Sequence, residues 1–171
     1  MKKKQKVDSF VGVIILLIGI LYLLFPLYHI NDLKMINIIM FSIIGIASLV
    51  QFFMNKNSKE YSGLFNFGAS ITFIILMLVF DISKPKNLSI CILAWVALEA
   101  IIKFKKSDYY NDKRDRMWKI NLVMLAIFII AGILASINLR YNEEVRMIVF
   151  GFRIFIDGIL EIMDPVVKSL I

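Results

Sequence analysis

Three ionisable side chains recur at four-residue steps near the end of the chain, in the stretch GFRIFIDGILEIMD at 151–164. They are Arg153, Asp157 and Glu161, and the residues around them are mostly apolar. A step of four residues advances only about 40° around an α-helix, so the three groups would form one stripe. Carboxylates beside an arginine can pair with it as a structural clamp, or they can exchange protons or hold a cation.

The chain that must position this stripe has the composition of a membrane protein. Of its 171 residues 60% are hydrophobic, and the mean hydropathy is +0.80. A soluble domain is usually nearer to about 45–50% apolar residues. The charged residues cluster in short segments between long apolar runs, which is the layout of a protein that crosses the bilayer several times.

Six apolar runs are each close to the roughly 20 residues that a helix needs to cross about 30 Å of hydrocarbon. They are Phe10–Tyr28, Leu33–Met54, Tyr61–Phe80, Leu88–Phe104, Met117–Leu139 and Val145–Met163. Pro26 is expected to end the first helix, and polar segments separate the later ones. We therefore expect an all-α integral membrane protein with six transmembrane helices in a single domain, residues 1–171.

The Lys and Arg residues predict the orientation of these helices. With the N-terminus inside, fourteen of the twenty lie on the cytoplasmic side, five lie on the other side and Arg153 lies within a span. Segments that remain in the cytoplasm are enriched in Lys and Arg. We expect both termini and a loop at 105–116 to be cytoplasmic, in a multi-pass protein of the bacterial cytoplasmic (inner) membrane.

The net charge of +7 has the same explanation. Most of the basic residues fall where insertion into the membrane requires positive charge, so nucleic acid is not expected as a partner. Besides the lipid bilayer itself, the expected partners are anionic lipid head groups and a membrane-protein partner or a second copy of the chain.

Small residues recur at matching places in successive pairs of spans, which predicts an internal repeat of three helical hairpins at about 10–54, 61–104 and 117–163. In lipid, close helix contacts favour such residues because they let the backbones approach. The expected packing residues are Gly12, Gly19, Gly45, Gly63, Ser70, Ala100, Gly132 and Gly158.

These segments carry a family resemblance. The stretches GVIILLIGILYLLFPL and IIGIASLV, with the weaker echoes GLFNFGASI and IFIDGILEI, resemble the HdeD-like family of short-repeat bacterial membrane proteins. The resemblance covers nearly the whole chain. It implies a fold of three hairpins with six transmembrane helices and an association with acid resistance, and it supplies no catalytic or ligand residues.

The repeat adds a second intramembrane acid to the stripe. Aligning Ala100 with Gly158 puts Glu99 level with Asp157. A charge that faces lipid costs about 2.5–3.5 kcal/mol on insertion scales, so Glu99, Arg153 and Asp157 should face the bundle interior. The first interpretation is a clamp in which Arg153 bonds to Asp157 and Glu99 completes the network. The alternatives are a proton or cation site, or Glu99 and Glu161 extending toward the inner surface.

Three classes of function remain open. The first is a non-enzymatic membrane protein with a role in envelope or acid stress. The second is a small transporter, channel or proton-handling protein that uses Glu99 and Asp157. The third is an accessory or immunity subunit of a membrane complex. The chain has a single cysteine and no HExxH, Walker or Rossmann motif, so we expect no enzyme activity, no cofactor and no metal site.

Overall fold

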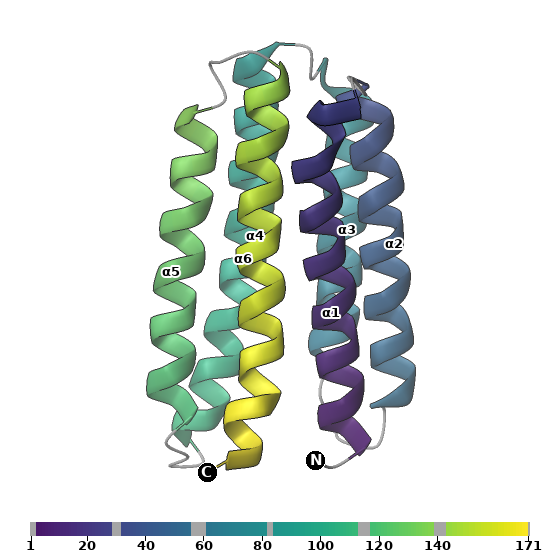
Figure 1. Cartoon of the computed structure of the whole chain (residues 1–171). Helices are drawn as coiled ribbons and strands as arrows, with labels where there is room; N and C mark the ends of the chain where they lie inside the picture. The colour runs from purple at the N-terminus through teal and green to yellow at the C-terminus, as the bar shows by residue number, and fades with distance from the viewer. Residues whose placement is uncertain are drawn as a thin grey trace.

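A computed structural model describes residues 3–28, 32–55, 61–81, 84–112, 117–138 and 143–170. The described chain is helical, with no strand in these ranges. In chain order the elements are α1 (Lys3–Leu24), the short 3₁₀ helix η1 (Phe25–Tyr28), α2 (Leu33–Met54), α3 (Ser62–Val79), α4 (Pro85–Asp112), α5 (Met117–Asn138) and α6 (Glu143–Leu170). The helices stand side by side as a bundle (Figure 1).

The helices form a ring in which each packs against its neighbours in the chain and α6 packs against α1. The closest packing is between α1 and α6, followed by α2 with α3 and α4 with α5. The pairs that the predicted hairpins would hold together, such as α1 with α2, pack less closely. The first residues of α1 and the last residues of α6 lie at the same end of the bundle (Figure 1).

Five helices, α1 to α5, are long and apolar enough to cross a membrane. This agrees with the expectation of a multi-pass membrane protein. The sixth, α6, is long enough at 28 residues but contains Arg153, Asp157 and Glu161. The prediction that Pro26 ends the first helix is confirmed, because α1 ends at Leu24 and the chain continues as η1.

The predicted cytoplasmic loop at 105–116 is largely wrong, because α4 continues without a break to Asp112. Residues 113–116 lie outside the described residues. The segment Lys105–Asp112 is polar but has no proline or glycine, so nothing in it interrupts the helical hydrogen bonds. A change from apolar to polar residues locates the membrane surface, and it does not by itself end a helix. For the same reason α1 begins at Lys3, before the apolar run that starts at Phe10.

Candidate functional site: a buried charged cluster between α4 and α6

The stripe on α6 faces α4, and the two helices run in register with an offset of 58 residues. Arg153 lies over Trp95, with the guanidinium carbon 3.8 Å from the ring centroid. Two turns further on, Lys103 Nζ lies 2.5 Å from Glu161 Oε1. The same offset puts Glu99 level with Asp157, as the alignment of the spans predicted. We call Glu99, Lys103, Arg153, Asp157 and Glu161 the charged cluster.

Lys103 is the cation that joins the two helices. Its Nζ donates a hydrogen bond to Glu161 Oε1 at 2.5 Å and lies 3.1 Å from Asp157 Oδ1. The contact to Asp157 is an ion pair without the alignment of a hydrogen bond, since Asp157 Oδ1 has no hydrogen-bond donor within the described chain. The ammonium group also lies 5.0 Å from the centroid of the Phe128 ring on α5. Lys103 therefore connects α4 to α6 across the face of α5.

Arg153 does not pair as the sequence predicted. Its side chain is only 2% exposed, and none of its three guanidinium nitrogens has a hydrogen-bond partner among the described residues. The guanidinium instead lies between two aromatic rings, with its carbon 3.8 Å from the centroid of Trp95 and 4.3 Å from that of Phe128. The predicted bond from Arg153 to Asp157 is therefore wrong. Ring faces attract a cation, and they attract it more strongly where water is excluded.

The acids of the charged cluster differ in their surroundings. Glu99 and Asp157 are 6% and 5% exposed, and Glu161 is closer to the surface, with 18% of its side chain exposed. Within the described chain Glu99 makes no ion pair shorter than 4 Å, although it lies one helical turn from Lys103 on the same face of α4. Glu161 is paired with Lys103.

The charged cluster contains one more carboxylate than cations: three acids face one lysine and one arginine. If all five groups were ionised, the cluster would carry one net negative charge. A small cavity of about 20 Å³ lies beside Glu161, lined in part by Lys103, Lys106, Asn121 and Glu161. This volume has room for about one water molecule. Lys106 adds a further positive charge beside Glu161.

An aromatic layer fills the bundle interior beyond Arg153. It consists of Tyr22, Phe41, Phe73, Trp95 and Phe150, which come from five helices and are each at most 3% exposed. The ring centroids of Phe41 are 4.1 Å from Phe73 and 4.7 Å from Trp95, and Tyr22 is 5.3 Å from Phe150. Aromatic pairs at these separations are favourable contacts. The charged cluster is therefore adjoined on this side by packed rings.

Sequence reasoning missed Lys103, which it counted among the cytoplasmic basic residues. A signal for it was present. The alignment that puts Glu99 level with Asp157 also puts Lys103 level with Glu161, with opposite charges at the same depth. In addition, Glu99 and Lys103 repeat on α4 the four-residue step of Asp157 and Glu161 on α6, so each helix presents a charged pair on one face.

Six of the eight predicted packing residues are glycines, and the space at each can be judged from what an added Cβ atom would meet. At Gly12, Gly19, Gly63, Gly132 and Gly158 it would lie less than 3.0 Å from a residue of another helix. At Gly45 the nearest atom is Ser70 Cβ at 3.4 Å, so these two predicted residues contact each other between α2 and α3. Ala100 is half-buried. Gly151, which was not predicted, would place a Cβ atom 2.6 Å from Tyr22 Cβ.

The tightest of these contacts join α1 to α6. Gly12 faces Ile162, Gly19 faces Phe155 and Gly158 faces Leu16. The residue number on α6 therefore falls as the residue number on α1 rises. The two helices are therefore antiparallel. Their glycines, placed seven residues apart on each helix, allow backbone-to-backbone contact over about three helical turns.

No protein-family model, curated protein or solved structure matches this chain. The resemblance to the HdeD-like family therefore stays a prediction. Within the part of the chain that the structure describes, no three or more His, Cys, Asp or Glu side chains are grouped so that they could hold a metal ion. The chemistry of the site is that of an ion-paired cluster with aromatic neighbours.

Proposed function

We propose that this chain is a non-enzymatic, multi-pass protein of the bacterial inner membrane that works through helix packing and contacts with a partner. Both termini would be cytoplasmic, and the six helices would derive from three repeated hairpins. The observation that supports a scaffold best is the aromatic layer beside Arg153. A channel or transporter needs a hydrated path on both sides of its buried charges, and packed rings adjoin one side here.

In this proposal the charged cluster fixes the positions of α4, α5 and α6. Lys103 bridges α4 and α6, while Arg153 reaches from α6 to rings on α4 and α5. The ion pairs of Lys103 would favour this arrangement of α4 and α6, because separating the two helices would leave buried charges without partners. The HdeD-like resemblance adds a role in envelope or acid stress, which the partner would define.

A measurement of proton flux tests this proposal. The full chain, reconstituted in liposomes with a pH gradient, should dissipate the gradient no faster than protein-free liposomes. A variant with Glu99→Gln, Lys103→Met, Arg153→Met, Asp157→Asn and Glu161→Gln removes every charge of the cluster. If that variant folds, it should keep the scaffold function, measured as survival of acid exposure by the bacterium that carries the gene.

A second candidate, a proton-handling protein, has one specific observation in its favour. The excess of one carboxylate over the cations gives the cluster a place for a proton, and the small cavity lies beside Glu161. Proton flux by the unaltered chain that is lost in the charge-free variant would support this candidate and contradict the scaffold. If the variant without the cluster's charges folds but no longer supports survival of acid exposure, that result would also support the proton-handling candidate and contradict the scaffold.

The orientation is tested separately by labelling with a membrane-impermeant thiol reagent. In a Cys91→Ala background, cysteines introduced by Lys34→Cys and Lys84→Cys should react in intact cells, and one introduced by Lys105→Cys should react only after lysis. All three lysines are exposed in the structure, so burial does not decide the result. Reaction of the third position in intact cells would overturn the predicted topology.

A further inference from the structure

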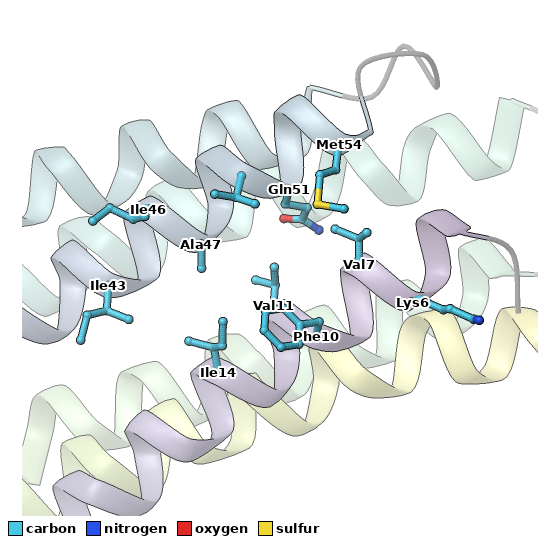
Figure 2. A pocket seen from close by; sticks show the side chains of 11 residues that line it. Lys6, Val7, Phe10, Val11, Ile14, Ile43, Ile46, Ala47, Gln51 and Met54 are labelled. Carbon is cyan, nitrogen blue, oxygen red and sulfur yellow. The ribbon is translucent and has the colours of Figure 1, made fainter.

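An apolar groove runs between α1 and α2 at the ends that carry Lys6 and Met54. Its volume is about 650 Å³, and its walls include Val7, Phe10 and Ile14 from α1 and Ile46, Ala47 and Val50 from α2. Figure 2 shows these two rows of side chains facing each other across an open space. Phe10, Ile46 and Val50 are 65%, 61% and 48% exposed, so the described chain does not cover the groove.

The groove exists because α1 is drawn toward α6. The glycines at 12 and 19 bring α1 into backbone contact with α6, and the nearest atoms to a Cβ added at either position all belong to α6. Among neighbouring helices of the ring, α1 and α2 are accordingly the least closely packed pair. The groove between α1 and α2 thus depends on glycines that lie in the interface between α1 and α6.

The length of the groove matches one leaflet of the membrane. From Met54 to Ile43, the lining residues of α2 span eleven helical steps, or about 16 Å. Half of a hydrocarbon core that is about 30 Å thick is about 15 Å. The groove therefore extends from the end of the bundle to about the membrane midplane, which is the extent of a lipid acyl chain. A helix from a second copy would need a groove that crosses the whole bilayer.

The positive charge at the mouth of the groove indicates that a lipid bound there would have an anionic head group. Lys6 lines the groove at this end, is exposed, and in Figure 2 extends away from the apolar side chains. The sequence adds Lys2, Lys3 and Lys4, separated from Lys6 by Gln5 alone. The nearby acid, Asp8, accepts hydrogen bonds from Gln51 Nε2 at 2.7 Å and Asn55 Nδ2 at 2.9 Å, so its carboxylate is held against α2.

We propose that this groove binds one acyl chain of an anionic phospholipid of the inner leaflet, with the phosphate of the head group beside Lys6. The anionic surface of the cytoplasmic leaflet attracts basic residues next to a span, and the groove supplies the apolar contact that makes the attraction site-specific. The proposal rests on the cytoplasmic position of the N-terminus, which the labelling experiment tests independently of lipid binding.

Native mass spectrometry of the full chain tests the site, with dioleoyl phosphatidylglycerol and dioleoyl phosphatidylcholine as the probes. The unaltered chain should retain one phosphatidylglycerol in preference to phosphatidylcholine. Lys6→Gln should reduce that preference about fivefold, which is the effect expected for one lysine near an anionic surface. Lys34→Gln, an exposed lysine at the opposite end of α2, is the matched control and should leave the preference unchanged.

Filling the groove tests the acyl-chain part of the proposal. Val50→Trp places a large side chain in the groove and should reduce retention of both lipids at least tenfold. Ile39→Trp changes an equally exposed residue of α2 outside the groove and should not. Equal retention of both lipids by all four variants would overturn the proposal. So would a change from dimer to monomer on Val50→Trp, because the groove would then be an interface between two copies.

Discussion

Replacing Lys103 by Met should lower the free energy of unfolding by about 3–5 kcal/mol, which is the usual cost of removing one partner from a buried ion pair. The ammonium group contacts both Asp157 and Glu161, and its side chain is only 13% exposed. After its removal, the remaining cations are Lys106, which lies beside Glu161, and Arg153, whose guanidinium lies against Trp95 and Phe128. Unfolding monitored by circular dichroism in detergent measures the loss.

The destabilisation should depend on pH in a defined direction. The Lys103→Met protein should regain stability as the pH falls, because protonation of the buried Glu99 removes one of the negative charges that Lys103 no longer balances. Lys106 beside Glu161 and Arg153 beside the rings remain as the facing cations. Lys105→Met is the matched control, because Lys105 is exposed on the same helix and should leave stability unchanged within about 0.5 kcal/mol.

A second variant separates lost charge balance from lost packing. Adding Asp157→Asn and Glu161→Gln to Lys103→Met removes the charges that were left without a partner, and it should restore most of the stability. If the triple variant is as unstable as Lys103→Met alone, the lysine stabilises the bundle through its alkyl chain and its contact with Phe128. The charged cluster would then not be what holds α4 to α6.

The helices could be predicted because each apolar segment must satisfy its backbone hydrogen bonds within itself, and this depends on the local sequence alone. A run of about 20 apolar residues must satisfy its own backbone hydrogen bonds in lipid, and an α-helix is the structure that does so within one segment. The residues at which the helices end were harder to predict. The helix α4 continues through Lys105 to Asp112, because polar residues mark the membrane surface without breaking the helix. The end of α1 near Pro26 was predicted correctly, because proline has no backbone N–H to donate and its ring clashes with the preceding turn of the helix.

The members of the charged cluster were partly predictable, and their partners were not. The four-residue step and the alignment of the spans indicated which residues share a face and a depth. Pairing depends on how far a side chain reaches and on what the third helix presents. Phe128 on α5 and Trp95 on α4 offer ring faces to Arg153, and this leaves Lys103 to bind the acids. The positions of rings on other helices are tertiary information that periodicity along one helix does not contain.

Gly12 and Gly19 of α1 and Gly158 of α6 were predicted as packing residues from their recurrence alone, whereas Gly151 of α6 was not. The structure gives the glycines of the bundle different amounts of space. A Cβ atom on Gly158 would lie 2.4 Å from the backbone nitrogen of Leu16 and 2.6 Å from its Cα atom. A Cβ atom on Gly68 would meet nothing within 4 Å. The same substitution at these two positions should therefore have opposite effects on stability.

Gly158→Ala should destabilise the protein by about 1–3 kcal/mol or more, because the added methyl group meets backbone atoms and the two helices must separate. Gly68→Ala should stabilise it by about 0.5–1 kcal/mol, because alanine loses less conformational entropy than glycine in a helix interior. Gly45→Ala, where the nearest atom is Ser70 Cβ at 3.4 Å, should fall between them. Unfolding midpoints of the three variants in one detergent give the order directly. A Gly158→Ala protein as stable as Gly68→Ala would mean that α1 and α6 are not in backbone contact, and the groove between α1 and α2 would lose its structural cause.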